Sequence, residues 1–159
     1  MRSSKASVAL LAATGLAVLT ASAPVQGDAG SRAKAAKTCK GEEATIVGKQ
    51  GDDELKGTKR ADVIVALGGH DFVKGRGGKD LICGGSGKDF LVGGTDADTI
   101  IGDSGDDILI GEGGDDKLFG KEGNDGMNGG GGKDLCDGGS DSDLAVAENC
   151  EQIRSADKV

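Results

Sequence analysis

Large apolar side chains recur at every ninth position over most of the chain, separated by polar, glycine-rich stretches. The side chains in this register are Leu55, Ile64, Val73, Ile82, Leu91, Ile100, Leu109, Leu118, Met127 and Cys136, followed by the smaller Ala145. Several lie in runs of β-branched or aromatic residues, such as Phe90-Leu91-Val92 and Ile108-Leu109-Ile110. Such runs between turn residues predict short strands, here of about three residues, within a repeat architecture.

An aspartate stands two residues before each of these positions, without exception. The series is Asp53, Asp62, Asp71, Asp80, Asp89, Asp98, Asp107, Asp116, Asp125, Asp134 and Asp143. Glycine lies four residues after nine of the eleven aspartates, with Ala66 and Ala147 as the exceptions, and two residues before eight of them. The unit is therefore G-G-x-G-x-D-x-U-x, where U is large and apolar. Because glycine adopts positive φ at no steric cost, the first half of the unit predicts a tight turn.

One strand of this length cannot bury an apolar face alone, so the units must stack. Two turns and two strands make a coil of about 18 residues, and successive coils stack at about 4.7 Å. Each repeat then lies on the repeat two further along, which gives two parallel sheets back to back with the U side chains between them. The pattern predicts an all-β fold, a right-handed parallel β-roll of roughly five coils.

Stacked turns would place the aspartate carboxylates in rows about 5 Å apart, where like charges repel. A divalent cation between the turns reverses the sign of that interaction. Calcium accepts six to eight oxygen ligands and tolerates mixed carbonyl and carboxylate sets, whereas magnesium demands tighter octahedral geometry. The alternative is a metal-free solenoid whose aspartates cap the turns. Asparagine would serve that role equally well, yet none of the eleven positions is Asn, so the pattern favours Ca²⁺, with several ions bound.

With this motif in so many copies, residues 44–147 resemble the RTX family, the haemolysin-type calcium-binding nonapeptide repeats. The Cys39-Lys40-Gly41 start and the Cys136…Cys150-Glu151 end resemble small secreted actinobacterial members. The resemblance implies a calcium-bound parallel β-roll. It also implies calcium ligands at Asp53, Asp71, Asp80, Asp89, Asp98, Asp107, Asp116, Asp125, Asp134 and Asp143, with Asp62 as a weaker one.

The turns are not expected to be equal. Asp62 has Arg60 where glycine is expected, and the unit of Asp71 begins with Ala66. Both turns are predicted to bind weakly or not at all. In two later units Asp96 and Asp141 replace glycine, which should strain the turn and add an acid. The best run extends from Asp80 to Asp134.

Composition narrows the class of protein. Tryptophan and tyrosine are absent and only three phenylalanines occur, so an aromatic-rich core is excluded. Thirty-one glycines would suggest disorder without the periodicity, and bound metal is the expected source of the missing stability. The net charge of −8 makes nucleic acid or an anionic membrane a poor partner.

The chain divides into five predicted parts. Residues 1–23 resemble a signal peptide, with a basic start, a short apolar stretch and an Ala21-Ser22-Ala23 cleavage motif. Pro24 disfavours cleavage at that bond, so the cut is placed there or a few residues later. Residues 24–38 form a flexible leader, 39–52 an N-terminal cap and first rung, 53–147 the roll, and 148–159 a C-terminal cap and tail. The predicted location is extracellular.

Four cysteines in an exported chain favour two disulfides. The favoured pairs are Cys39–Cys83 and Cys136–Cys150, with free buried thiols as the alternative. Cys83 follows a U position and should face outward, where the segment before Ala44 could reach it. Cys136 faces inward near the last coil, and Cys150 would close that end.

Motifs that mimic enzyme sites are explained by the repeat. Gly102-Asp103-Ser104-Gly105-Asp106 resembles a serine-protease nucleophile box, but the only histidine, His70, lies about four repeats away. Residues 75–79 mimic a phosphate-binding loop without the Ser or Thr that should follow its lysine. No catalytic function is predicted.

The outward strand positions are unusually apolar. One face carries Phe72, Phe90, Val92, Ile108 and Ile110, and the other carries Val63, Val65, Leu81, Ile101 and Phe119. Exposed apolar surface often marks an interface, although plain β-propensity explains it too.

The predicted function is a secreted calcium-binding protein that folds on binding calcium. The alternatives are an adhesion, matrix or self-associating protein that uses these faces, and an accessory subunit of an extracellular enzyme.

Overall fold

The computed structural model describes residues 37–141, 143–145 and 150–155. These residues belong to one compact unit, Ala36–Val159. The predicted signal peptide, and the leader as far as residue 36, lie outside the described residues. Within the described part no helix is long and apolar enough to cross a membrane.

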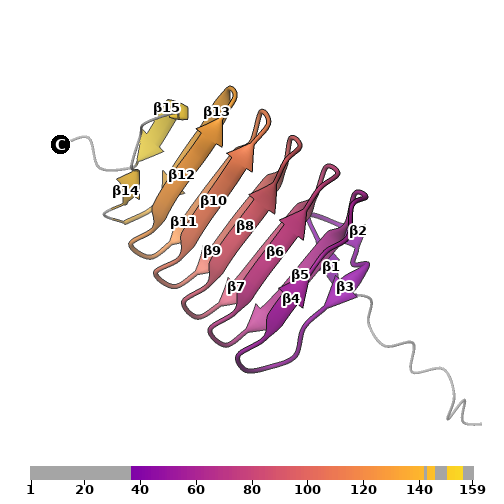
Figure 1. Cartoon of the computed structure of the whole chain (residues 1–159). Helices are drawn as coiled ribbons and strands as arrows, with labels where there is room; N and C mark the ends of the chain where they lie inside the picture. The colour runs from indigo at the N-terminus through magenta and orange to yellow at the C-terminus, as the bar shows by residue number, and fades with distance from the viewer. Residues whose placement is uncertain (1–36, 142, 146–149, 156–159) are drawn as a thin grey trace, which may run out of the picture. The chain divides into compact units, whose positions relative to one another are not determined.

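The described residues form fifteen strands and no helix (Figure 1). The strands are β1 (Thr38–Cys39), β2 (Glu42–Glu43), β3 (Ile46–Val47), β4 (Glu54–Lys56), β5 (Val63–Gly68), β6 (Phe72–Arg76), β7 (Leu81–Ser86), β8 (Phe90–Gly94), β9 (Thr99–Ser104), β10 (Ile108–Gly113), β11 (Lys117–Glu122), β12 (Gly126–Gly131), β13 (Asp134–Gly139), β14 (Leu144–Ala145) and β15 (Cys150–Ser155). Beyond the short antiparallel hairpin β1–β2, they build two parallel sheets.

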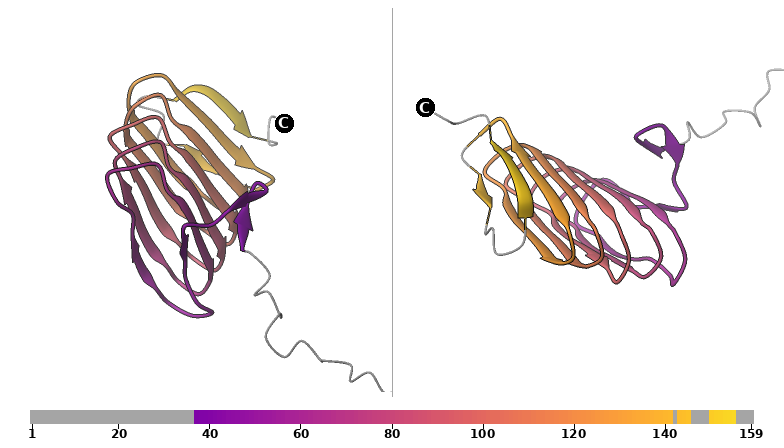
Figure 2. Two further views of the ribbon diagram at one scale, coloured as in Figure 1. Left: turned by 90° about the vertical axis from the view of Figure 1, so that its right-hand side faces the viewer. Right: turned by 90° about the horizontal axis from the view of Figure 1, so that it is seen from above.

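Odd and even strands separate into different sheets. The six-stranded sheet has the order β14-β12-β10-β8-β6-β4, and the seven-stranded sheet has the order β15-β13-β11-β9-β7-β5-β3. Between β6 and β8, for example, Phe72 pairs with Phe90, eighteen residues later. The two views in Figure 2 show successive coils stacked on one another, with the sheets facing each other. The predicted parallel β-roll of about five coils is confirmed.

The strands are longer than the sequence pattern predicted. Most contain five or six residues rather than about three. The pairing continues past the apolar residue into the turn, so that Leu67 pairs with Gly85 and Gly68 with Ser86. Because equivalent turns lie directly on one another, their backbone N–H and carbonyl groups continue the ladder that the apolar residues begin. The prediction of three-residue strands was wrong for this reason.

The core lies between the sheets and consists mainly of U side chains. Ile64, Val73, Ile82, Leu91, Ile100, Leu109, Leu118, Met127 and Cys136 form one cluster together with Ala66, each at most 2% exposed. Full burial of a large apolar side chain stabilises by roughly 1.5–3 kcal/mol. The inward direction predicted for this register is therefore observed from Ile64 to Cys136, and Leu55 packs partly buried against the cluster.

Each end of the stack is closed by a different device. At the N-terminal end the β1–β2 hairpin lies on the outer face of the seven-stranded sheet, where Cys39 is bonded to Cys83. At the other end β15 pairs with β13, and Cys150 is bonded to Cys136. Both pairs are those favoured from the sequence. The hairpin thus covers part of a sheet face at one end, and β15 adds a last strand to the seven-stranded sheet at the other.

Candidate metal site

The eleven aspartates form two rows, one at each edge of the roll. Those before the six-stranded sheet are Asp53, Asp71, Asp89, Asp107, Asp125 and Asp143, and those before the seven-stranded sheet are Asp62, Asp80, Asp98, Asp116 and Asp134. Among these aspartates, each one from Asp71 to Asp134 is only 1–3% exposed. Nine-residue spacing thus alternates the carboxylates between two edges, and eighteen-residue spacing stacks them along each edge.

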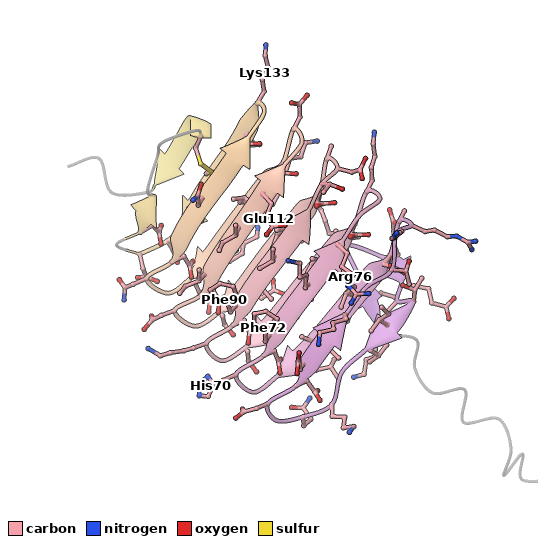
Figure 3. The ribbon with its side chains drawn as sticks, in the orientation of Figure 1. His70, Phe72, Arg76, Phe90, Glu112 and Lys133 are labelled. Atoms are coloured by element: carbon pink, nitrogen blue, oxygen red, sulfur yellow. A yellow bond between two sulfur atoms is a disulfide. The ribbon has the colours of Figure 1, made fainter. Side chains whose placement is uncertain are left out.

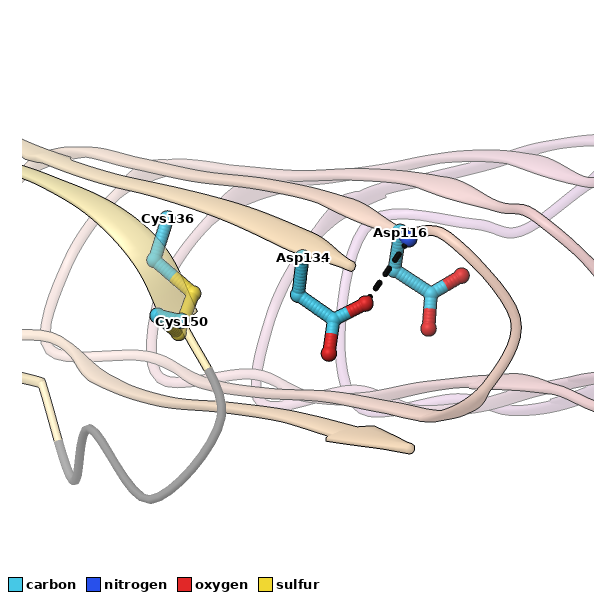
Figure 4. Close-up of a disulfide and its surroundings, with 4 residues drawn as sticks. All are labelled: Asp116, Asp134, Cys136 and Cys150. Carbon is cyan, nitrogen blue, oxygen red and sulfur yellow. Dashed lines mark hydrogen bonds between the residues drawn. A yellow bond between two sulfur atoms is a disulfide. The ribbon is translucent and has the colours of Figure 1, made fainter. Parts of the chain in front are cut away.

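One oxygen of each carboxylate is used by the neighbouring coil. The backbone N–H of Asp116 donates to Asp134 Oδ1 at 2.9 Å, as Figure 4 shows. The same bond joins each aspartate to the one eighteen residues later, from Asp53 with Asp71 to Asp125 with Asp143, at 2.8–3.2 Å. The turn-capping role considered as an alternative to metal binding is therefore real, but it occupies a single oxygen.

The second oxygen is left without a partner along most of both rows. Buried Oδ2 atoms that accept no hydrogen bond belong to Asp71, Asp80, Asp89, Asp98, Asp107, Asp116, Asp125, Asp134 and Asp143. A buried unpaired carboxylate oxygen is costly, and its presence requires an explanation. Nine in regular series point to a ligand that the repeats bind in common.

A space beside each free oxygen exists because glycine lies five residues before the aspartate. A Cβ added at Gly84 would lie 2.5 Å from Asp89 Oδ2 and 2.9 Å from the carbonyl oxygen of Gly102 in the next coil. The same relation holds at Gly93 and Gly111. Each such glycine therefore leaves room between a carboxylate oxygen and a carbonyl oxygen. Ala66, which is fully buried, is the described position in this series that carries a methyl group.

The turns have a fixed and partly strained backbone. The residue four before the aspartate has positive φ in every turn from Asp71 onward, whether or not it is glycine. Arg76, Glu112 and Lys121, for example, have φ of 87°, 74° and 90°. Such angles are unfavourable for residues with a Cβ and are typical of functional turns. The repeat thus imposes one turn geometry on sequences that do not favour it locally.

Burial raises the pKa of seven carboxyls, from Asp71 to Asp125, that belong to the two rows. The pKa of Asp98 and Asp107 rises to about 7, and that of Asp80 and Asp116 to about 6. Desolvation is the main cause; the backbone hydrogen bond from the preceding aspartate opposes it, and nearby carboxylates add to it. For Asp71, Asp89 and Asp125 the pKa is also raised by burial. A cation bound beside these carboxylates would offset the cost of burying them in charged form.

These donors suit calcium. The described residues contain no cluster of three His, Cys, Asp or Glu side chains, so a cation here would depend on backbone carbonyls together with few carboxylates. A hard ion that accepts many oxygens fits such a set, and soft or nitrogen-preferring metals do not. The aspartates with free Oδ2 atoms and the turn carbonyls beside them would hold the ion. It would supply positive charge and crosslinks between coils.

The first two turns differ from the rest. Asp53 Oδ2 accepts the backbone N–H of Lys49 at 2.5 Å, and Asp62 Oδ2 accepts the N–H of Thr58 at 2.7 Å and its hydroxyl at 2.9 Å. We call these two the closed turns and those from Asp71 onward the open turns. The sequence had marked Asp62 as weaker through Arg60, but it gave no such signal for Asp53.

Asp96 and Asp141 behave differently from their prediction. Neither has positive φ, so the expected strain is absent from these positions. Asp96 Oδ2 accepts the N–H of Gly78 at 2.9 Å, and Asp141 Oδ2 accepts that of Gly123 at 3.1 Å. Each carboxylate caps the turn of the preceding coil, and neither joins the inner rows. An acidic side chain can thus replace glycine at this position.

Ser104 and His70 each form a hydrogen bond with a different partner. The Ser104 hydroxyl donates to the Gly85 carbonyl at 3.3 Å, and His70 Nδ1 accepts the N–H of Lys88 at 2.9 Å. Neither contact resembles the pairing of a nucleophile with its base. Residues 75–79, which mimic a phosphate loop, comprise the end of β6 and most of the turn that leads to β7.

Comparison with known proteins agrees with this geometry. The family model of the RTX calcium-binding nonapeptide repeat matches four times, at residues 56–91, 84–118, 92–127 and 111–145. Together the matches extend over residues 56–145, more than half of the 159-residue chain. No curated protein and no solved structure matches it. The repeats of this family bind calcium and form a structural roll, so the chain is a calcium-binding repeat protein and belongs to the RTX calcium-binding nonapeptide repeat family.

Proposed function

We propose that this protein is exported and that its roll completes folding when calcium binds outside the cell. The observation that supports this is the series of nine buried Oδ2 atoms without a partner. Without metal, folding must bury these carboxylates against desolvation and mutual repulsion. With calcium, the same burial places charge and carbonyl oxygens around a cation, so binding free energy becomes folding free energy.

The export part of the proposal rests on residues 1–23, with their basic start, apolar stretch and Ala21-Ser22-Ala23 motif. Extracellular calcium modules have dissociation constants of about 10⁻⁴–10⁻³ M. Sites in that range stay empty at cytoplasmic calcium and fill outside. The chain would then remain open for export and fold on arrival.

The test is circular dichroism of the full chain, with disulfides intact, during titration with calcium and separately with magnesium. We expect β-structure to increase cooperatively with calcium and little with magnesium. A spectrum that is fully β-rich in calcium-free buffer and does not change on titration would contradict folding on binding. Export is tested separately, by sequencing the N-terminus of protein recovered from the culture medium.

A second function, self-association, is favoured by one face of the roll. Phe72 is 40% exposed and Ile108 47% exposed on the outside of the six-stranded sheet. The rings of Phe72 and Phe90 stack at 5.5 Å, side by side in Figure 3. The corresponding face of the other sheet is covered by the β1–β2 hairpin, which leaves this face as the accessible one.

Sedimentation velocity of the calcium-loaded protein tests self-association. A dimer that the double substitution Phe72→Ser, Ile108→Ser converts to monomer would support it. Exposed Glu122, on the other sheet, offers the matched control Glu122→Ser. A monomer at high concentration would exclude the outer face of the six-stranded sheet as a contact between copies. A different partner protein would then be the next to test on this face.

A further inference from the structure

The N-terminal end of the roll satisfies its aspartates without a metal. In the closed turns, the second carboxylate oxygen accepts a backbone N–H from Lys49 or Thr58, and Thr58 adds its hydroxyl. From Asp71 to Asp143 that oxygen has no protein partner. The change from one kind of turn to the other is abrupt along the chain.

The edge of each sheet explains the closed turns. They follow β3 and β4, which are the terminal strands of the two sheets and contain only two and three residues. An edge strand leaves some N–H groups outside the ladder. The N–H groups of Lys49 and Thr58 turn inward onto their own aspartates, and neither residue has the positive φ found four residues before Asp71 and every later aspartate.

The third turn lacks the space that the later turns provide. At Ala66 a methyl group stands at the position where Gly75, Gly84 and the later glycines leave room between two oxygens. Ala66 is fully buried within the core cluster, so its methyl group has no route outward. Three successive turns are therefore poor cation sites for two structural reasons: the turns of Asp53 and Asp62 are closed by backbone N–H groups, and that of Asp71 is filled by the methyl group of Ala66.

Other contacts stabilise this end instead. The Cys39–Cys83 bond fastens the hairpin to β7, and Cys39 is only 1% exposed. Beneath the hairpin a second apolar cluster joins Val65, Cys83 and Ile101, from three successive strands of the sheet. Lys40 places its ammonium group 5.0 Å from the ring centre of Phe119, on the next strand. Cation–π contacts of this kind are attractive, so the hairpin contacts residues of four successive strands of the seven-stranded sheet.

We propose that residues 38–68, which we call the N-terminal clamp, fold without calcium and that calcium loads from the turn of Asp80 onward. This inference rests on the proposed calcium-dependent folding and adds the order in which the coils fold, starting at the N-terminal end. In a solenoid each coil is stabilised by its neighbour, so the first coil is the hardest to form. The clamp supplies that first coil with a disulfide and apolar contacts, and the calcium-binding coils then add to its exposed edge.

Hydrogen exchange read by mass spectrometry, on the full chain in calcium-free buffer and in calcium, tests this directly. We expect β3 and β5, which pair with each other, to be protected in both conditions and β8–β13 to be protected only in calcium. If calcium protects all strands together and none is protected without it, folding on binding survives and the clamp is refuted. Protection of every strand in both conditions would refute both proposals.

Two substitutions, one that removes a methyl group from a turn and one that adds a methyl group to another turn, test which turns bind calcium. Ala66→Gly creates the missing space, and Gly84→Ala fills an existing one. By calorimetry we expect the first variant to bind one more calcium ion than the natural chain and the second to bind one fewer. If Ala66→Gly leaves the number of ions unchanged while Gly84→Ala lowers it, Ala66 is not what keeps the third turn empty, and the stated loading boundary is wrong.

The two disulfides provide a matched pair of variants. With Cys39→Ser and Cys83→Ser together, we expect protection of β3 and β5 in calcium-free buffer to be lost. With Cys136→Ser and Cys150→Ser together, that protection should remain. Equal loss in both variants would show that β3 and β5 depend on the whole stack and would overturn the clamp. If a variant fails to fold, hydrogen exchange of the natural chain with and without calcium still decides whether the clamp forms.

Discussion

At the scale of the residue, each repeat aspartate divides its carboxylate between two tasks. Oδ1 accepts the N–H of the aspartate eighteen residues earlier and so fixes the register between coils. Oδ2 faces the space beside a glycine and stays free. Capping and metal binding are therefore complementary roles of one side chain. Asparagine could supply the Oδ1 contact but would bring no charge for a cation.

Replacing Asp107 by Asn should have opposite effects with and without calcium. The amide keeps the acceptor for the N–H of Asp89 and removes a carboxyl whose pKa burial raises to about 7. At pH 8 in calcium-free buffer the variant should form more β-structure than the natural chain, because folding then buries no charge at this position. In calcium it should be less stable and bind fewer ions.

Circular dichroism in calcium-free buffer measures the first effect, and thermal melts and calorimetry in calcium measure the second. Asp106→Asn is the matched control, since that neighbouring side chain is 42% exposed and its pKa is lowered by the hydrogen bond from Lys88. It should leave both measurements nearly unchanged. Less β-structure in Asp107→Asn than in the natural chain without calcium would mean that burying this charge does not oppose folding of the metal-free roll.

Replacing Gly102 by Ala should remove a site and destabilise the roll. The new methyl group would overlap Asp107 Oδ2 and lie 2.9 Å from the Gly120 carbonyl oxygen. Overpacking of this kind costs about 1–3 kcal/mol. Gly113→Ala is the control, because the only atom within 4 Å of its added Cβ is the Gly94 carbonyl oxygen, at 4.0 Å. Urea denaturation in calcium should separate the two variants, and equal midpoints would contradict this account.

At the scale of the element, strand and turn are a continuous unit. The ladder that begins at the apolar residues runs on into the turn, as the pairing of Glu112 with Gly130 shows. Positive φ at Glu112 then follows from its neighbours and not from its own preference. A strand therefore extends as far as the stacked turns keep equivalent backbone groups opposite one another.

The C-terminal strand should depend on its disulfide. The Cys136–Cys150 bond closes a loop of 14 residues, and constraint of the unfolded chain by such a loop contributes about 3 kcal/mol. Changing both residues to Ser should lower the free energy of unfolding by about that amount and expose β13 and β15 to hydrogen exchange. β8 should keep its protection in calcium. Unchanged exchange of β13 would show that pairing with β15 suffices without the bond.

At the scale of the whole molecule, the two buried rows couple stability to pH. Folding raises the pKa of Asp98 from its ordinary 3.8 to about 7 and that of Asp80 to about 6, so folding favours their protonated forms. Their contribution is complete below about pH 4 and is lost as pH rises through 6 to 7. The pairs Glu54–Lys56 and Lys88–Asp106 act in the opposite sense, but they lie on the surface and are screened.

Without calcium the chain should therefore form more β-structure at pH 5 than at pH 8. In calcium the roll should be less stable at pH 5 than at pH 8, because protons compete with the ion for the same carboxylates. Circular dichroism without calcium and melting curves in calcium, at both pH values, measure this reversal. The same order in both buffers would mean that the buried carboxylates are not the calcium ligands.

The sequence by itself determined the repeat, the inward side chains and the two rows of aspartates. A strict period of nine fixes which residue faces the core and which begins the turn, because strands and tight turns are set by local chemistry. It marked Ala66 and Arg60 as departures, since each replaces a glycine within one unit. Both disulfide pairs followed from the same frame, in which Cys83 faces outward and Cys136 inward.

Only the tertiary structure decided which carboxylate oxygens are free. Asp53 ends a unit with glycine at both expected places, yet the N–H of Lys49 closes its turn. The reason lies in its place at the edge of the stack, where a strand has a neighbour on one side only. The extra length of the strands has a related cause, since it needs an equivalent turn directly above or below. A local period repeats the same chemistry in every unit, whereas contacts across eighteen residues depend on whether a neighbouring coil is present.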